Sequence, residues 1–420
     1  MDYRKFVEVK QELRLTLSSE HFSVHYGLRN PRCGRGLGPN GVGDPVLLRW
    51  YLSALERLYR AMSSPPWNRP APKTDASGKT RVYVCDLDRI GIHDPFTSAD
   101  RERNPFIVLS CRSYEPLTDG AMRRAAAEAV HEATHVFNAR ERPFDRPVDF
   151  PWWAWLNEAM ATYMESVILP GNQDYFRFLA NWIDVPGIAL NDWRAAYQGC
   201  LFLHYLARAV DHGFPNRIWT DSGPGDKPLA TIDRLASESG QVFATADAGK
   251  RDLFAQGYAM DSYFLRDHTG GCFAPDLCCR FGDRAVVETF ELSAGDPAGA
   301  VKETLPHLAS HYFRCFVGRN VDRVRLTLRA LRVTNPMPFK VEAAIVRADL
   351  SCGQRQLLLP VRGRGRSGSG VVTAEVTGVT ERDFDHLVLV VSNCTHENKD
   401  LPMDHPLPLG DAYEFEIAVT

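Results

Sequence analysis

Spacings of apolar residues divide the chain into three regions. In the first, HFSVHYG alternates as a strand does, and apolar residues in PVLLRWYLSALERLYRAM recur every three or four positions, which predicts an amphipathic helix. RVYVCDL and PFIVLSC are short apolar runs that predict two further strands. Residues 1–118 are therefore predicted to form an N-terminal α/β part, with these elements at 21–27, 45–62, 81–87 and 105–111.

From Asp119 onwards the pattern becomes helical. Apolar residues three or four positions apart recur in stretches long enough for several turns of helix. The region 119–315 is therefore predicted to be helical, with helices near 119–139, 154–168, 173–183, 192–212, 228–239, 249–267 and 297–311.

After Phe316 alternating and apolar runs return. Six such runs, separated by turn residues, are typical of a β-sandwich. Residues 316–420 are predicted to form this C-terminal domain, in which RGRGRSGSG (362–370) is expected to be a solvated hairpin connection. The fold class expected for the whole chain is α+β.

Composition and charge narrow the class of protein. The 420 residues are 44% apolar and 24% charged, which is a globular composition. A net charge of −3 argues against a protein dedicated to nucleic acids or to membrane surfaces. No apolar run is long enough for a transmembrane helix, and the N-terminus lacks the apolar core of a secretory signal, so a cytoplasmic location is favoured over a secreted one. The ten cysteines form no CxxC pair, which argues against a structural zinc knuckle.

The most informative stretch is AVHEATHVF (129–137), inside the first helix of the helical region. Positions four apart lie on the same face of a helix, so His131 and His135 can direct two imidazole nitrogens at one metal ion. Glu132 lies beside them and can reach a water molecule at the metal without being a ligand. This is the spacing of HExxH metallohydrolases, which bind zinc. The alternative is an ordinary alanine-rich helix, and the motif alone does not decide between the two.

A second stretch supplies a third ligand. FPWWAWLNEAMATYMES (150–166) becomes helical around Glu158, and 22 residues separate Glu158 from His135. This gap is long enough for a loop that returns the chain to a second helix beside the first. A carboxylate delivered there completes a His₂Glu set with an open fourth position, as in catalytic zinc sites. Taken alone, Glu158 would be a surface residue near a helix start.

Together, HEATH and WLNEAMATY resemble the gluzincin metallopeptidases. The second stretch is similar to the WLNEGxAxY pattern of the aminopeptidase N type, with Ala159 where those enzymes usually have Gly. The wider layout, over roughly residues 80 to 270, resembles the peptidase MA-like families. The resemblance implies a gluzincin-like catalytic domain, made of a small mixed sheet plus a helical bundle. It also implies a Zn²⁺ ion held by His131, His135 and Glu158, with Glu132 as general base.

The sequence also departs from these families. The 22-residue gap is longer than in aminopeptidases of this type, and Thr162 stands where a thermolysin-like gluzincin has Asp. No Gly-rich exopeptidase segment precedes the HEATH stretch. The fold and the metal therefore carry over more safely than aminopeptidase specificity does.

Further roles are assigned by position and by resemblance. A metal-bound histidine usually donates its second N–H to a carboxylate or carbonyl, and Glu128 and Glu165 are the candidates nearby. For Glu128, a solvated carboxylate on the polar face of the helix is the favoured interpretation. AAYQGCLFLHYL resembles the YxxxxLFxxYL helix of peptidase MA-like proteins. That resemblance makes Tyr197 the first candidate for an oxyanion donor and His204, on nearly the same face, the second. Packing of both in a helical core is the competing interpretation.

The predicted function is a zinc metallopeptidase that hydrolyses a peptide or protein substrate. The strand PFIVLSC is expected to offer an edge on which an extended peptide adds, and the C-terminal domain is expected to bind a protein or carbohydrate partner. The alternatives are a zinc-dependent hydrolase of the amidase type and a catalytically inactive gluzincin-like binding scaffold.

Overall fold

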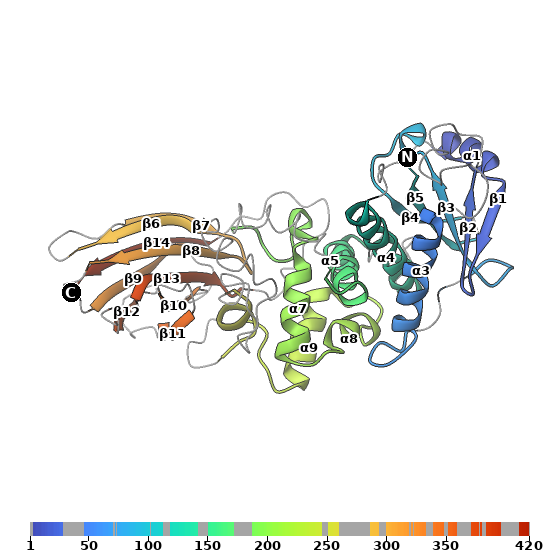
Figure 1. Ribbon diagram of the computed structural model, residues 1–420. Helices are drawn as coiled ribbons and strands as arrows, with labels where there is room; N and C mark the ends of the chain where they lie inside the picture. Colours follow the sequence, from blue (N-terminus) through green and yellow to red (C-terminus); the bar gives the residue numbers. More distant parts are fainter. Residues whose placement is uncertain are drawn as a thin grey trace. The chain divides into compact units, whose positions relative to one another are not determined.

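The protein is described by a computed structural model (Figure 1). It is a mixed α+β chain with several sheets. The chain divides into two compact units, one of residues 1–150 and 157–177, the other of residues 151–156 and 178–420. The described residues are 3–27, 46–69, 72, 74–100, 102–111, 118–141, 150–171, 187–245, 251–259, 286–293, 300–318, 321, 323–332, 339–347, 352–358, 371–377, 379, 384–395 and 411–419.

The first unit is built on a sheet with the strand order β1-β2-β3-β5-β4. The inner strands β2, β3 and β5 are parallel, and the two outer strands pair antiparallel with their neighbours. All four elements predicted for residues 1–118 are present. The elements are α1 (Tyr3–Glu12), β1 (Leu15–Ser18), β2 (Phe22–Tyr26), α3 (Val46–Met62), β3 (Thr80–Cys85), the 3₁₀ helix η1 (Leu87–Ile90), β4 (Phe96–Ala99), β5 (Pro105–Ser110), α4 (Asp119–Glu141) and most of α5 (Phe150–Ile168).

The expectation that PFIVLSC offers an open edge is wrong. Strand β5, which contains this sequence, is paired on both sides, with β3 and with β4. The edge strand on this side is β4, in which three residues are half-buried and the fourth, Ala99, is exposed. Such a short strand without an apolar run leaves no clear periodic signal in the sequence. The edge nearest the HEATH helix therefore belongs to a strand that the sequence did not reveal.

Helices cover both faces of this sheet. On one face, Phe6 of α1 stacks on Phe106 at 5.5 Å between ring centroids and meets Tyr83 edge to face. Helices α3 and α4 pack side by side, and α4 also packs against β4 and β5 (Figure 1). The hydroxyl of Tyr51 in α3 donates to the carbonyl of Ser110, at 2.8 Å. The helix that carries HEATH is thus fixed against both α3 and the sheet.

The second unit begins with helices. They are η2 (Trp193–Ala195), α7 (Gly199–Ala209), α8 (Phe214–Thr220), α9 (Pro228–Glu238) and the π-helix η3 (Phe254–Ala259). The helix predicted at 228–239 is confirmed, whereas the one predicted at 192–212 is broken into η2, a turn and α7. The helix predicted at 173–183 lies outside the described residues, as does most of the one predicted at 249–267.

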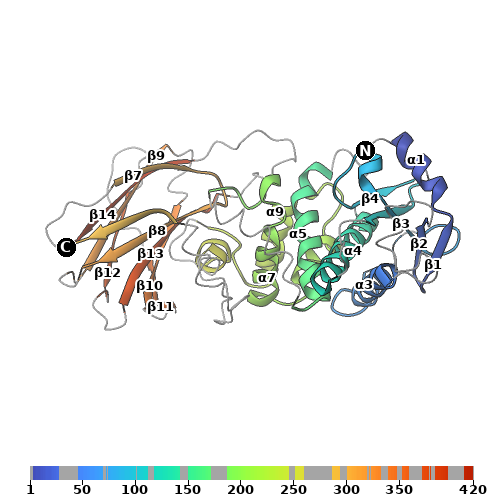
Figure 2. The ribbon, with the colours of Figure 1, turned by 45° about the horizontal axis from the view of Figure 1, so that its top comes forward.

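A β-sandwich follows in the same unit (Figure 2). Its two sheets have the strand orders β11-β10-β13-β8-β6 and β12-β9-β14-β7, and side chains from both form one core. The six strand runs predicted after residue 316 correspond to β9 to β14. The strands are β6 (Val286–Leu292), β7 (Ala300–Leu305), β8 (Ser310–Val317), β9 (Arg323–Arg332), β10 (Phe339–Arg347), β11 (Cys352–Leu358), β12 (Val371–Thr377), β13 (Phe384–Asn393) and β14 (Asp411–Val419).

The helix predicted at 297–311 is wrong, because this stretch contains β7 and the start of β8. Val301 and Leu305 are four residues apart, a spacing that places side chains on one face of a helix but also on one face of a strand. Pro306 then separates the two strands, since it cannot donate a backbone hydrogen bond. Strands that share the sandwich sheets begin at Val286, earlier than the boundary at 316.

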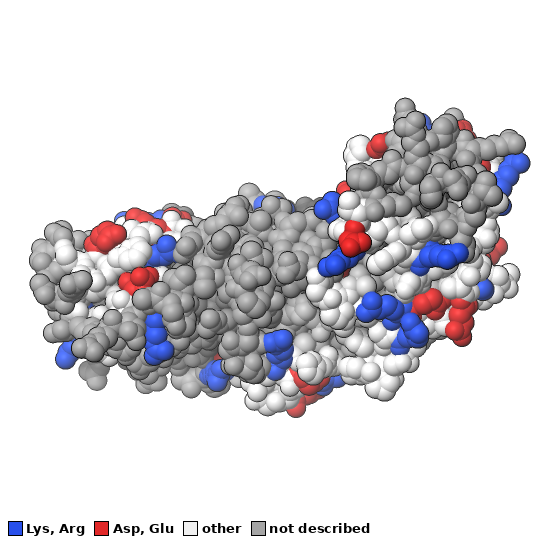
Figure 3. All heavy atoms as spheres, viewed as in Figure 1, with Lys and Arg blue, Asp and Glu red and all other residues white. Residues whose placement is uncertain are grey.

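The surface carries charges of both signs (Figure 3), in keeping with the small net charge of −3. On the face shown in Figure 3, basic and acidic side chains of the described residues are interspersed rather than gathered by sign. Within the described part of the chain, none of the helices combines the length and the apolar character that a bilayer crossing needs. Cys111, directly after β5, is disulfide-bonded, whereas Cys85, Cys200, Cys315 and Cys394 are not part of disulfides.

Candidate metal centre

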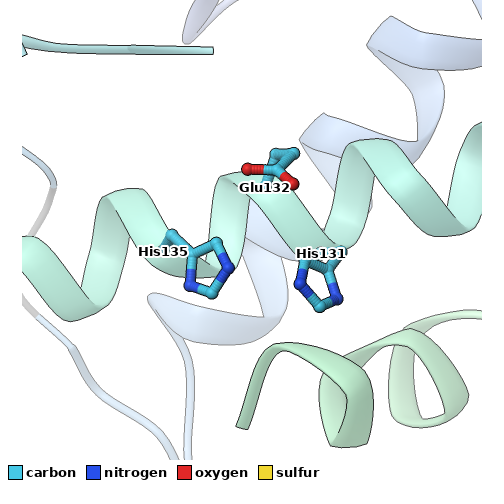
Figure 4. Close-up of side chains that lie close together, drawn as sticks. All are labelled: His131, Glu132 and His135. Carbon is cyan, nitrogen blue, oxygen red and sulfur yellow. The ribbon is translucent and has the colours of Figure 1, made fainter. Parts of the chain in front are cut away.

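Helix α4 presents the two histidines of HEATH on consecutive turns. The helix starts at Asp119, where the backbone N–H of Ala121 donates to the hydroxyl of Thr118 at 3.1 Å, which is an N-cap. Alanines on several sides of α4 are buried, which lets neighbouring elements approach closely. His131 and His135 are both buried, and their ring centroids are 4.8 Å apart. Figure 4 shows the two rings beside each other, with Glu132 between them along the helix.

Glu158 of α5 faces both imidazoles. Its Oε2 lies 3.0 Å from Nε2 of His131, and its Oε1 lies 3.5 Å from Nε2 of His135. Helix α5 starts at Phe150 with a proline in its first turn, so Glu158 lies well inside the helix rather than at its exposed start. The structure therefore brings together the three residues that the sequence predicted as metal ligands.

A second carboxylate orients His131 from behind. Glu165 Oε1 lies 2.8 Å from Nδ1 of His131, so Nε2 of the same ring is the nitrogen that faces Glu158. Glu165 was one of two candidates for this position from the sequence. Thr162, which occupies the position of the expected Asp, is buried, and its hydroxyl has no hydrogen-bond partner among the described residues. The orienting carboxylate comes from the next turn of α5 instead.

The charges of the site favour a positive charge between the two rings. Burial alone would lower the pKa of His131, but hydrogen bonds to Glu158 and Glu165 raise it well above its usual value. Burial would likewise raise the pKa of Glu158, yet His135 and His131 hold it far below the ordinary range. Glu158 therefore remains ionised, and it stabilises a cation at this point, either an imidazolium proton or a metal ion.

Glu132 is held from the other side, by the sheet. The hydroxyl of Thr97 in β4 lies 2.9 Å from Glu132 Oε2 and 2.7 Å from the backbone carbonyl oxygen of Glu132. Burial raises the pKa of Glu132, and the nearby histidines and the Thr97 hydrogen bond only partly oppose this effect. A buried carboxyl whose pKa is shifted toward neutrality suits the uptake and release of a proton.

Two carboxylates therefore compete for the place of third ligand. His131, Glu132 and His135 each offer a ligand atom, and these atoms lie within 4.8 Å of one another. Glu158, however, contacts Nε2 of both rings, whereas Glu132 is engaged by Thr97. Glu158 is therefore better placed than Glu132 to complete a ligand set with the two histidines.

The donor set fits a zinc ion. Two imidazole nitrogens and one carboxylate converge, and His131 already has the carboxylate partner that metal-bound histidines usually have. Nε2 of His135 joins the site, because it lies 3.5 Å from Glu158 Oε1, whereas its Nδ1 is buried without a hydrogen-bond partner among the described residues. Nitrogen and oxygen donors of this kind suit zinc better than the all-oxygen sets of calcium or magnesium.

A series of side-chain hydrogen bonds next to the site connects three segments of the first unit. The guanidinium of Arg69 donates to Asn138 Oδ1 at 2.6 Å, and Asn138 Nδ2 donates to Asn157 Oδ1 at 2.8 Å. Asn157 directly precedes Glu158, and Asn138 lies one turn after His135 on α4. Arg69, Asn138 and Asn157 are all buried, and burial lowers the pKa of Arg69 to about 10. These contacts left no signal in the sequence, because Arg69 lies within a proline-rich loop that has no periodicity.

The two candidate oxyanion donors lie in the second unit. Tyr197 is half-buried in the turn before α7, so the expectation that it shares a helix face with His204 is wrong. His204 is in α7, where burial and the nearby Arg208 lower its pKa to about 3. At neutral pH its ring is therefore uncharged and would act as an N–H donor rather than as a cation. The catalytic role of both residues stays a prediction.

Comparison with known proteins does not place this chain in a family. No family model and no curated protein matches the sequence. CorA, described as a surface-associated copper-binding protein important in Methylomicrobium album BG8 copper acquisition, aligns with 32% of this chain and 98% of its own at 9% identity and a TM-score of 0.19. BtGH115A, a 4-O-methyl-α-glucuronidase, aligns with 72% and 40% of the two chains at 12% identity and a TM-score of 0.17. The insecticidal δ-endotoxin Cry8Ea1 of Bacillus thuringiensis aligns with 31% and 22% at 12% identity and a TM-score of 0.14. Similarities this weak carry no argument about fold or function.

The contact between Glu165 and His131 leads to a test of metal affinity. Glu165→Gln should weaken zinc binding by about 10- to 100-fold, because an amide fixes and polarises the His131 ring less well than a carboxylate does. Competition with a chromogenic chelator measures this affinity. Glu238→Gln, at an exposed position on α9, is the matched control and should leave the affinity unchanged. An equal affinity in the Glu165 variant would show that this carboxylate does not support the site.

Proposed function

We propose that this chain is a zinc-dependent metallopeptidase. The observation that carries the proposal is the position of Glu158, whose two carboxylate oxygens lie 3.0 Å and 3.5 Å from Nε2 of His131 and His135. An ordinary alanine-rich helix would have no reason to bury two histidines against one carboxylate on a neighbouring helix. Burying these groups is costly unless a partner compensates for it.

Each residue of the site has a chemical task in this proposal. His131, His135 and Glu158 would hold the ion, and Glu165 would keep the His131 ring in position. A zinc ion there would supply Lewis-acid polarisation of a carbonyl and would acidify a water molecule. Glu132 would accept the proton of the attacking water and deliver it to the leaving amine. Because Oε2 of Glu132 accepts from Thr97, Oε1 is the oxygen that exchanges this proton.

The substrate class follows from the sheet next to the site. Strand β4 is one of the two edge strands of the sheet in the first unit, and α4 packs against it. An extended peptide can add to such an edge through backbone hydrogen bonds, with little dependence on its sequence. We therefore propose that β4, rather than β5, receives the substrate.

Metal analysis combined with peptide digestion tests the proposal. The purified protein should bind one zinc ion per chain and should cleave members of a mixed peptide library, as detected by mass spectrometry. A chelator should abolish cleavage, and added zinc should restore it. Stoichiometric zinc with hydrolysis of simple amides but not of peptides would favour a zinc-dependent hydrolase of the amidase type. Absence of stoichiometric zinc and of cleavage would instead favour a binding scaffold, with the β-sandwich as the surface for a protein or carbohydrate partner.

A further inference from the structure

Among the described residues, Thr97 joins the edge strand β4 to the HEATH motif by hydrogen bonds. Its hydroxyl oxygen lies 2.7 Å from the backbone carbonyl oxygen of Glu132 and 2.9 Å from Oε2 of the same residue. Thr97 itself is fixed by antiparallel pairing of β4 with β5, where it faces Ile107. Nothing in the HExxH pattern points to this residue, which lies 35 positions before Glu132.

We propose that Thr97 is a positioning residue that holds the Glu132 carboxylate in the orientation needed for proton transfer. This inference rests on the proposed function, because it assigns Thr97 a role in the same reaction. A glutamate side chain has several rotatable bonds, and a base is effective only when its oxygen stays within hydrogen-bond reach of the proton it takes. Contact with both ends of Glu132 fixes the carboxylate relative to the helix backbone.

The two contacts also allow Thr97 to hydrogen-bond to Glu132 both when the Glu132 carboxyl group is ionised and when it is protonated. A threonine hydroxyl has one proton to donate and lone pairs with which to accept. When Glu132 is ionised, the hydroxyl donates to Oε2. When Glu132 holds the exchanged proton on Oε1, its Oε2 becomes a weaker acceptor, and the hydroxyl can rotate to donate to the backbone carbonyl oxygen of Glu132 instead. Rotation about one C–O bond therefore keeps the contact satisfied throughout the proton cycle, without movement of the strand or of the helix.

The position on β4 gives the contact a further consequence. The strand that carries Thr97 is the one proposed to receive the peptide, so substrate and base are located by the same four-residue element. Loss of the hydroxyl should leave the strand and its edge intact, because valine and threonine have similar shapes and both favour strands. The expected defect is therefore in the chemical step rather than in substrate binding.

A pair of substitutions separates these effects. Thr97→Val should lower kcat by about 10- to 100-fold, with little change in KM and unchanged zinc content, as expected when a hydrogen bond to a charged group is lost. Thr97→Ser keeps the hydroxyl and should restore most of kcat. Thr231→Val is the matched control, because the Thr231 hydroxyl on α9 is buried without a hydrogen-bond partner among the described residues. It should leave kcat and KM unchanged.

Thermal unfolding of the zinc-free protein gives a readout that does not depend on activity. If Thr97 contacts Glu132, the losses in Tm caused by Thr97→Val and Glu132→Met should not add in the double variant. Additive losses together with an unchanged kcat in Thr97→Val would overturn this inference and leave the proposed function standing. A wild-type protein that binds zinc but cleaves no peptide would overturn the proposed function and the catalytic role of Thr97 with it. In that second case the Tm losses of Thr97→Val and Glu132→Met would still be non-additive, whereas in the first case they would be additive.

Discussion

Glu132→Gln is expected to lower kcat/KM for peptide hydrolysis by about 10²- to 10⁴-fold while zinc remains bound. Glutamine preserves the size of the side chain and an oxygen that can accept from the Thr97 hydroxyl, which lies 2.9 Å from Glu132 Oε2. An amide cannot take up a proton from water at neutral pH, however, so the general base is lost. The proposed ligands are untouched, and the metal site should therefore keep its affinity.

The experiment compares activity and metal content in the same samples. Glu238→Gln is a suitable control, because Glu238 is exposed on α9 and forms a surface ion pair with Arg234 at 2.7 Å. Wild-type activity in the Glu132 variant would exclude this residue as the base. Loss of zinc would show instead that Glu132 is a ligand, a role that its distance from the histidines permits.

The juxtaposition of the three proposed ligands was predictable, because helix geometry brings the two histidines together. In HEATH, a spacing of four residues places His131 and His135 on one face, whatever the rest of the fold does. The only unknown was whether the chain returns Glu158 to that face, and the gap of 22 residues left room for a loop that does so. The structure places Glu158 against both rings. Local periodicity and one loop length were sufficient for this part of the site.

The residues that support the site could not be predicted in the same way. Thr97 lies in a short edge strand, and Arg69 lies in the loop between α3 and β3, so neither belongs to a long periodic stretch. Their contacts with Glu132 and Asn138 join segments 35 and 69 residues apart in the sequence. Such contacts depend on how the strands are ordered in the sheet. A single sequence does not specify that order.

The β-sandwich shows a related limit of prediction from sequence patterns. In β10, Val341, Ala343 and Ile345 alternate with Lys340 and Glu342, a pattern that predicts one core face and one solvated face. The first three residues do belong to the core between the two sheets. Lys340 and Glu342 are also buried, because η3 packs against β10 and β13 on the other face. Alternation identifies the two faces of a strand, but it does not show whether a further layer covers the polar one.

Lys340→Met is consequently expected to destabilise the protein far more than a surface substitution would. The Lys340 ammonium forms an ion pair with Asp252, and the two side chains are 2% and 0% exposed. Asp252 also accepts from the backbone N–H of Ala255 at 2.6 Å, at the start of η3. Removal of the cation leaves a buried carboxylate without its counter-ion, which should lower the free energy of unfolding by about 3–5 kcal/mol.

Denaturant titration of three variants tests this expectation. Lys340→Met combined with Asp252→Asn should recover most of the loss, because the amide removes the uncompensated charge and its oxygen can still accept from Ala255. Arg234→Met breaks only exposed contacts, the ion pair with Glu238 and a hydrogen bond to the carbonyl oxygen of Asp221, and should change the free energy of unfolding by less than about 1 kcal/mol. If the double variant were as unstable as Lys340→Met alone, the loss would come from packing of the lysine stem rather than from the buried charge. The packing of η3 on the sandwich would then depend on apolar contacts instead of on this ion pair.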